Sequence, residues 1–183
     1  KFVANPNWDA MLKDTQAAIN ELKKDGPVAI IGFCMGGSIA FLAATRLDGL
    51  SAAIAYYGGQ IAKFADEKPK VPMQMHFGEK DQGIPMSDVE TIKGKRTESE
   101  IYTYPDAPHG FHCDERASYT EAAAKVAWPR ALEFLSRCRE RYPFDRLVSH
   151  TYPLDRIDDA FRDAEWHNRE AVPSRITRAA LAP

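Results

Sequence analysis

Several features are scarce in this 183-residue chain, and each scarcity removes a class of protein. The chain has three cysteines, at unrelated spacings and without a Cys-x-x-Cys pair: Cys34, Cys113 and Cys138. Such a set is neither a disulfide framework nor a zinc pattern, and it indicates a reducing, cytoplasmic location. No run of about eighteen apolar residues occurs, so no membrane span is expected. No charged-then-apolar signal peptide opens the chain.

Charge of one sign is also lacking. The net charge is -2, and no block of basic residues of the kind that follows phosphates is present. Nucleic-acid binding is therefore not expected. The 44% hydrophobic and 27% charged residues are typical of a globular protein of one domain, or of one domain with an appendage. Because Lys1 leads almost directly into a helix and no initiator Met precedes it, we expect a piece that lacks its beginning.

What the chain does contain is an alternation of helical and strand-like segments. Helices are predicted over residues 7–24, from 36 to near 46–49, 87–93 and 118–139. Short apolar strands are predicted over residues 28–33, 52–57, 71–77 and 100–104. Strands that alternate with helices indicate βαβ units and a mostly parallel sheet whose strands are buried on both faces. The fold class is therefore α/β.

The last predicted helix is long and amphipathic. Pro129 should kink this helix or shift its start. Its predicted core residues are Ala122, Val126, Ala127, Ala131, Phe134 and Leu135. From about residue 142 the character of the sequence changes. We treat residues 141–183 as an appended tail with a strand-like stretch at 147–149, a short helix at 155–162 and a last strand at 176–181.

The strongest motif is Gly32-Phe33-Cys34-Met35-Gly36-Gly37, between a buried strand and a helix. A nucleophile on a sharp strand-to-helix turn needs small flanking residues, which Gly32 and Gly36 provide, while Gly37 lets the helix pack closely. Cys34 would lie at a helix N-terminus, where partial positive charge favours a thiolate. The Met35 N–H would point to a developing oxyanion. The alternative is a buried structural cysteine beside packing glycines.

A thiol nucleophile needs a general base, and His109 lies in the loop after the fourth predicted strand, where a base belongs. His76 lies inside a strand and is interpreted as structural. His112 should point elsewhere. A metal cluster of His109, His112 and Cys113 is an alternative, but it has no distant fourth ligand.

The base in turn needs an acidic partner, and the chain order nucleophile, acid, histidine favours Asp81. Asp81 follows the third predicted strand, at the same carboxyl edge of the sheet as Cys34 and His109. Glu79 and Asp106 are rivals. We interpret Glu79 as a solvated turn residue and Asp106 as a cap or turn former.

With these residues in place, the sequence resembles the dienelactone hydrolase (carboxymethylenebutenolidase) family over about residues 1–138. The resemblance is carried by four stretches and by the segment after them: residues 31–37, 56–58, 76–81, 104–111, and Arg116 with Ser118-Tyr119. It implies an α/β-hydrolase fold, a Cys34–Asp81–His109 triad, and hydrolysis of a small lactone or ester through an acyl-enzyme with no cofactor and no metal. It also implies that Arg116 holds a substrate carboxylate; a surface salt bridge is the alternative.

The sequence departs from that family at both ends. Family members carry about four strands before the first helix, and these strands supply a second oxyanion donor. Without them, the fold would be the C-terminal half of the sheet, with an open apolar edge at residues 28–33 through which chains could associate. Residues 143–161 resemble the C-terminal end of zinc-type medium-chain alcohol dehydrogenases, but they carry neither the dinucleotide fingerprint nor zinc ligands.

The sequence therefore predicts a cytoplasmic thiol hydrolase of small lactones or esters. Two alternatives remain. The chain could be catalytically silent without an N-terminal segment, or it could be a redox or interaction module that uses Cys34 as a sensor.

Overall fold

The computed structural model of the chain describes residues 6–141, 150–152 and 179–181, with side chains described for residues 6–138. Its core is a sheet of four parallel strands in the order β1-β2-β3-β4. The strands are β1 (Val28–Phe33), β2 (Leu50–Tyr56), β3 (Met73–Gly78) and β4 (Glu100–Tyr104). The predicted α/β class is confirmed, and each strand lies within two residues of its predicted start.

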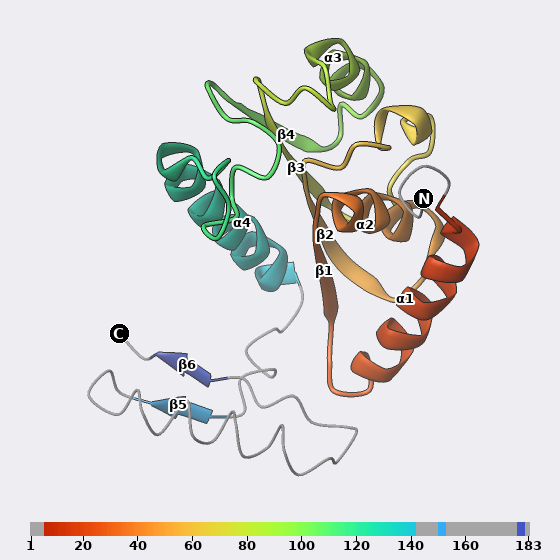
Figure 1. Cartoon of the computed structure of the whole chain (residues 1–183). Helices are drawn as coiled ribbons and strands as arrows, with labels where there is room; N and C mark the ends of the chain where they lie inside the picture. Colours follow the sequence, from red (N-terminus) through yellow and green to blue (C-terminus); the bar gives the residue numbers. More distant parts are fainter. Residues whose placement is uncertain (1–5, 142–149, 153–178, 182–183) are drawn as a thin grey trace.

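Helices cover both faces of this sheet (Figure 1). One face carries α1 (Trp8–Leu22) and α2 (Met35–Arg46), together with the short helix η1 (Ala62–Phe64) and α3 (Met86–Lys95). The other face carries α4 (Glu121–Arg141). The strands of a parallel sheet all run in the same direction, so their C-terminal ends lie at one edge. That edge therefore collects the loops after β1, β2, β3 and β4.

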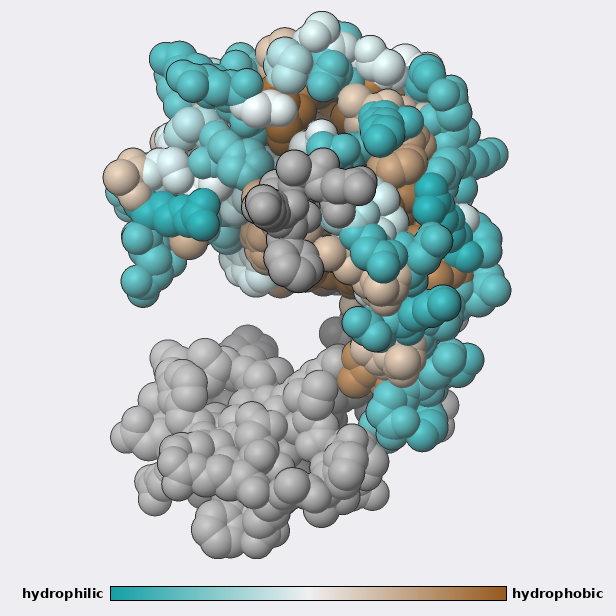
Figure 2. Space-filling model, turned by 45° about the vertical axis from the view of Figure 1, so that its right-hand side comes forward, coloured by the Kyte–Doolittle hydropathy of each residue, from teal (hydrophilic) through white to brown (hydrophobic). Residues whose placement is uncertain are grey.

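The first helix begins where its sequence provides a cap. The Asn7 side chain accepts a hydrogen bond from the Ala10 N–H at 3.1 Å, which satisfies one of the free donors at the start of α1. Leu12 and Ile19 are the buried residues of this helix and face α2. Its other side is exposed, and with this side turned forward the surface in Figure 2 is mainly hydrophilic.

Burial differs between the strands. Every residue of β2 and β3 is buried, as predicted for central strands of a parallel sheet. The prediction of burial on both faces is wrong for β1, where Ala29, Ile30 and Ile31 are only partly buried and Phe33 is exposed. The reason is position, because β1 is an edge strand among the described residues and pairs with β2 alone.

Helix α4 departs from its prediction in two ways. It starts at Glu121 and runs through Pro129, so the proline does not set its start. Ala122 and Val126 are exposed instead of buried. Ala127, Ala131 and Phe134 are buried as predicted, and the buried stripe is completed by Ala123, Ala124 and Cys138. This stripe packs against β2 and β3 on both sides of Pro129. The packing keeps the helix continuous although Pro129 has no backbone N–H to donate.

A row of rings crosses the sheet on the α4 side. Phe33, Tyr56, His76 and Tyr102 occupy paired positions on β1, β2, β3 and β4. Their ring centroids are 4.7, 4.3 and 5.7 Å apart in turn, and each pair is stacked. Because these residues precede the loops at the carboxyl edge, the row forms the floor beneath those loops.

Two further strands are described in the C-terminal part of the chain. β5 (His150–Tyr152) pairs in parallel with β6 (Ala179–Leu181) as a separate two-stranded sheet. The predicted last strand at 176–181 thus overlaps β6. The predicted strand at 147–149 and the predicted helix at 155–162 lie outside the described residues. None of the described helices is both long enough and apolar enough to cross a bilayer.

Candidate active site

Cys34 is the single residue between the end of β1 and the start of α2. Its backbone has φ 55° and ψ -119°, a conformation that L-residues rarely adopt and that costs about 1–3 kcal/mol. Hydrogen bonds hold it there: the Cys34 N–H donates to the Tyr56 carbonyl at 3.0 Å, and its own carbonyl accepts from Gly37 at 3.0 Å. The thiol is exposed. The predicted sharp turn is therefore present, and the buried structural interpretation of this cysteine is wrong.

The glycines around the turn do not all serve the purpose predicted for them. A Cβ on Gly32 would lie 1.9 Å from the Gly36 carbonyl oxygen, and one on Gly37 would lie 2.5 Å from the Tyr56 carbonyl oxygen. Both positions therefore require glycine. A Cβ on Gly36 would meet nothing within 4 Å, so the prediction that Gly36 must be small for steric reasons is wrong.

His109 and Asp81 lie beside the thiol, as predicted. His109 Nε2 is 3.1 Å from Cys34 Sγ, and His109 Nδ1 is 2.7 Å from Asp81 Oδ2. The Asp81 side chain is completely buried, and its other oxygen accepts the Gly83 N–H at 2.8 Å. Because a carboxylate can only accept, Nδ1 is the donor and Nε2 faces the sulfur. The three side chains form one hydrogen-bonded series.

The loops that carry the acid and the base are bonded to each other. The Glu79 N–H donates to the Tyr104 carbonyl, and the Lys80 N–H donates to the Ala107 carbonyl, both at 3.0 Å. A Cβ on Gly78 would lie 2.2 Å from the Ala107 oxygen, so this approach also depends on glycine. Since the two loops are in backbone contact, the Asp81–His109 distance is set by the end of the sheet and not by flexible side chains.

Electrostatics at His109 favour its charged form. The hydrogen bond that His109 donates to Asp81 is the largest cause, and with the weaker hydrogen bond to Cys34 it outweighs burial and raises the pKa of His109 to about 9. At neutral pH the ring is therefore protonated. An imidazolium beside a thiol stabilises the thiolate, which is the reactive form.

Met35 follows Cys34 as the first residue of α2. Its backbone N–H has no hydrogen-bond acceptor within the described part of the chain. Free N–H groups and the positive end of the helix dipole at this position suit an anion. Its side chain is exposed and makes up part of the surface next to the thiol.

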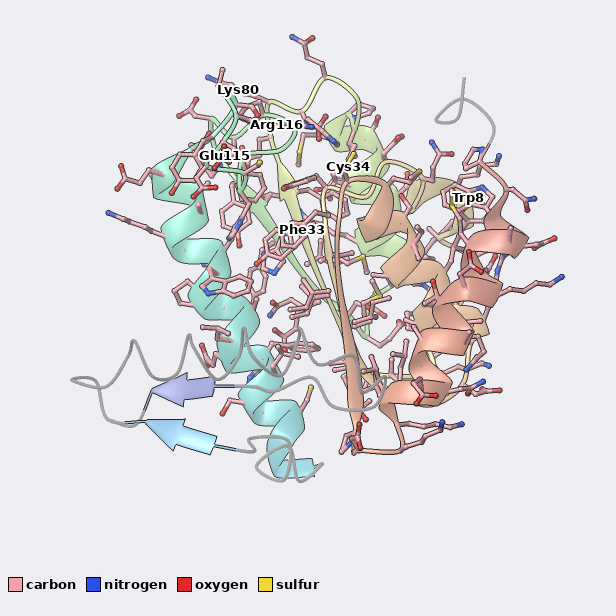
Figure 3. All side chains as sticks on the ribbon, turned by 60° about the horizontal axis from the view of Figure 1, so that its bottom comes forward. Trp8, Phe33, Cys34, Lys80, Glu115 and Arg116 are labelled. Atoms are coloured by element: carbon pink, nitrogen blue, oxygen red, sulfur yellow. The ribbon has the colours of Figure 1, made fainter. Side chains whose placement is uncertain are left out.

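Arg116 lies in a series of turns that follows His109. Its Nη1 is 3.7 Å from where a Cβ of Gly110 would be, so the side chain folds back towards the base. Figure 3 shows it at the same end of the sheet as Cys34 and Lys80. Among the described residues no carboxylate lies within 4.0 Å of Arg116. The surface salt bridge that the sequence left open is therefore not formed in this part of the chain.

The rivals of Asp81 are occupied elsewhere. Glu79 is exposed and accepts a hydrogen bond from Thr103 at 2.8 Å. Asp106 is exposed, has a positive φ of 60°, and forms an ion pair with Lys80. Both interpretations, a solvated turn residue and a turn former, are confirmed.

The other histidines near the site point away from the thiol. His76 is completely buried in β3, and both of its ring nitrogens are hydrogen-bonded. His112 packs its ring against Phe33 and Trp128 at centroid distances of 5.7 and 5.6 Å. No group of three potential metal ligands is gathered within the residues that the structure describes.

One residue of the site, Tyr57, received no role from the sequence. It follows β2 directly and is almost completely buried, with its ring centroid 5.1 Å from that of His109. Its φ is 39°, so it has a positive φ as Cys34 does. The available sequence signal was its position immediately after a buried strand, at the edge where the other site residues lie.

Comparison with known proteins gives a family and several relatives for this chain. The model of the "Dienelactone hydrolase family" matches residues 2–139. A Salmonella typhimurium protein named "Putative carboxymethylenebutenolidase" is 36% identical over 122 residues, which are 59% of this chain and 45% of that protein. The "Carboxymethylenebutenolidase" of Pseudomonas putida is 29% identical over 146 residues, 75% of this chain and 61% of that protein. The chain thus spans about half the length of the curated relatives it matches.

Two solved structures are similar to this chain. A crystal structure from Klebsiella pneumoniae, described as a "Putative Dienelactone Hydrolase", superposes with a TM-score of 0.67 at 31% identity. The match covers 73% of this chain and 63% of that chain. An α/β hydrolase from a deep-sea metagenome superposes with a TM-score of 0.57 at 19% identity, covering 70% of this chain and 64% of that one, and shows the shared fold.

Proposed function

Because this chain belongs to the dienelactone hydrolase family, we propose that its site hydrolyses small esters or lactones through a Cys34–His109–Asp81 triad. The observation that carries the proposal is the hydrogen-bonded series from Asp81 through His109 to an exposed thiol on a strained turn. Strain of this kind persists where the surrounding structure enforces it, and it is concentrated at functional sites.

The proposed reaction begins from the ion pair of thiolate and imidazolium. Cys34 Sγ attacks the carbonyl carbon, and the resulting oxyanion accepts a hydrogen bond from the Met35 N–H. When the tetrahedral intermediate collapses, the C–O bond breaks and the leaving oxygen takes the proton from His109 Nε2. An acyl group remains on sulfur as a thioester.

The second half restores the ion pair. Neutral His109 takes a proton from a water molecule, whose oxygen attacks the thioester carbon. The C–S bond then breaks and the thiolate departs beside the newly charged imidazole. Asp81 keeps its charge throughout and holds Nδ1 as the donor. No step requires a cofactor or a metal.

Arg116 supplies the positive charge of the proposed substrate site. A guanidinium without a carboxylate partner among the described residues, on the same edge as the thiol, suits a substrate that carries a carboxylate. The name of the Pseudomonas putida relative, carboxymethylenebutenolidase, denotes action on such a lactone. We therefore propose carboxylate-bearing lactones or esters as the substrates.

The cellular setting of this activity follows from other features. The thiols of Cys34 and Cys113 are free, which favours a reducing location such as the cytoplasm. Among the described residues β1 has no strand on its outer side, and its partly exposed Ile30 and Ile31 favour packing of further polypeptide there, from the same protein or from a second chain.

Replacement of the nucleophile tests the proposal. Cys34→Ala should reduce the hydrolysis of p-nitrophenyl acetate by the 183-residue chain by at least about 10³-fold, because the thioester can no longer form. Cys113→Ala is the matched control, a free thiol nearby that should retain activity. Equal losses in both variants, or an inactive wild-type chain that unfolds cooperatively, would contradict the proposal.

A further inference from the structure

The backbone of Tyr57 has a positive φ, which is unusual for a residue at the end of a strand. Among the described residues, the non-glycine residues with positive φ are Cys34, Tyr57 and Asp106, and each follows the end of a strand at the edge that holds the site. The backbone of Tyr57 is fixed by a 2.8 Å hydrogen bond from its N–H to the His76 carbonyl. A bulky residue in this conformation is unfavourable, so its placement points to a task for its side chain.

The body of the Tyr57 side chain is fully packed. The residue is 3% exposed, and its ring is 5.1 Å from His109 and 5.4 Å from Phe111 between centroids. Its direction is thereby fixed.

The hydroxyl of Tyr57 is free, in contrast to the hydroxyl of its neighbour. Tyr56 donates to the Ala127 carbonyl at 3.2 Å, whereas the Tyr57 hydroxyl has no hydrogen-bond partner within the described chain. It is also absent from the set of enclosed polar atoms, so solvent can reach it. A buried tyrosine normally finds a partner for its O–H.

The Tyr57 hydroxyl lies among the residues of the proposed site. Its protonation responds to the thiols of Cys113 and Cys34 and to the guanidinium of Arg116, so it lies within the electrostatic reach of all three. Burial, with a smaller contribution from the thiols, raises the pKa of Tyr57 to about 12. The hydroxyl therefore keeps its proton in the physiological pH range and can donate it in a hydrogen bond.

We propose that the Tyr57 hydroxyl donates a hydrogen bond to the substrate carboxylate whose charge Arg116 neutralises. This inference rests on the proposed function and adds a specificity residue to it. Tyr57 supplies a fixed donor from a packed ring, and Arg116 supplies charge from a longer, exposed side chain. A hydrogen bond to a charged group contributes more than one between neutral groups, so its loss should weaken binding about tenfold.

A purely structural role for Tyr57 predicts a different result. The ring could serve only to support His109, in which case the hydroxyl would be dispensable. Tyr57→Phe separates the two roles, because it retains the ring and removes the donor alone. Tyr119→Phe, at an exposed tyrosine in the same series of turns as Arg116, is the matched control.

The test compares p-nitrophenyl hydrogen succinate, which carries a carboxylate, with p-nitrophenyl acetate, which does not. We expect Tyr57→Phe to raise the ratio of KM for the succinate ester to KM for the acetate ester about tenfold. Arg116→Gln should show the same selectivity, and Tyr119→Phe should leave the ratio unchanged. Equal changes for both esters, or no change in KM, would overturn the inference.

A second measurement does not depend on turnover. Succinate should slow the alkylation of Cys34 by iodoacetamide, followed by mass spectrometry of the Cys34 peptide. About ten times more succinate should be needed in Tyr57→Phe, with protection expressed relative to the alkylation rate of each protein without succinate. Equal protection of both proteins, or no protection of the wild type, overturns the inference. If protection is seen and neither ester is hydrolysed, the proposed function fails and the carboxylate site stands.

Discussion

Two histidines of this fold make the same number of hydrogen bonds and have opposite acid–base behaviour. His109 bonds Asp81 and Cys34 through its two nitrogens, and its pKa is raised to about 9. His76 bonds Tyr104 at 2.7 Å and Gln74 at 2.8 Å, and its pKa is lowered to about 3. The number of bonds to a ring therefore does not decide its charge.

The difference lies in the partners and in burial. His109 is partly exposed and faces a carboxylate, which stabilises the imidazolium. For His76 the main cause is burial. The positive charge of Arg130 on α4 and that of His112 lower the pKa further, and Glu100 on β4 opposes them only weakly. One histidine is held as a cation and the other as a neutral ring.

The neutral ring has a defined tautomer. Glu100 can only accept, so the Gln74 amide nitrogen faces it at 2.9 Å and the amide oxygen faces His76 Nε2. Nε2 is therefore the donor, and Nδ1 accepts the Tyr104 hydroxyl. A second proton on this ring would remove that acceptor, which explains why protonation should destabilise the fold.

The largest contrast between the two histidines should be in catalysis. His109→Gln removes the proton donor and acceptor of the reaction, and we expect kcat/KM for p-nitrophenyl acetate to fall by about 10³–10⁴-fold. Its free energy of unfolding in urea should also fall at neutral pH, because the variant loses the charged ring that bonds the buried Asp81 carboxylate. The control is His112→Gln, at the neighbouring histidine that points away from the thiol. A comparable loss in that variant would show that the loop, and not the base, had been damaged.

The next contrast is in stability. The folded pKa of His76, about 3, lies below the ordinary value of 6.5. The part of the free energy of unfolding that depends on a neutral His76 ring is therefore complete above pH 6.5, and it is lost as the pH falls towards 3. Between pH 7 and pH 5 this loss should be about 2 kcal/mol. His109 has the opposite sign, because its raised pKa gives stability that is lost as the pH rises through about 9.

Urea unfolding at several pH values measures the His76 contribution. We compare wild type with His76→Gln, in which the titrating ring is absent and the other histidines remain. The variant should be less stable at pH 7, and its stability should depend less on pH between 6.5 and 5. Parallel curves for the two proteins would show that His76 does not titrate in the unfolding reaction.

The sequence was informative where a task depends on local chain geometry. The turn at Cys34, the two loops that carry Asp81 and His109, and the strands that end beneath them all have local signals in glycines, apolar runs and chain order. Their mutual approach followed from one rule, that parallel strands end at a common edge. The fold class and the positions of the three site residues could therefore be predicted.

The sequence was uninformative where partners come from distant parts of the chain. The bonds of His76 depend on Tyr104 and, through Gln74, on Glu100, and nothing within β3 indicates that pairing. The direction of the Tyr57 hydroxyl depends on a positive φ that its residue type does not favour. In α4 the exposed residue is Val126 while Ala123 and Ala124 are buried, and the apolar pattern of an alanine-rich helix does not determine that choice.

The smallest expected effect, and the sharpest test of the comparison, is a shift in the pKa of His109. Asp81→Asn replaces the carboxylate by a neutral amide, so the pKa of His109 should fall from about 9 by roughly one unit or more. The titration of the His109 ring protons by NMR measures the shift. Glu79→Gln, at the exposed carboxylate that bonds Thr103, is the control and should leave the titration unchanged.

The same substitution would also change which nitrogen carries the proton. The NH₂ group of the introduced amide can donate to His109 Nδ1, which leaves the single proton on Nε2, where a neutral histidine can no longer accept one from water. Activity should then be lost even at a pH where the ring is neutral. If the midpoint stays near 9 in Asp81→Asn, the sulfur of Cys34 and not the carboxylate holds the charge on His109, and the contrast with His76 rests on that sulfur and on burial.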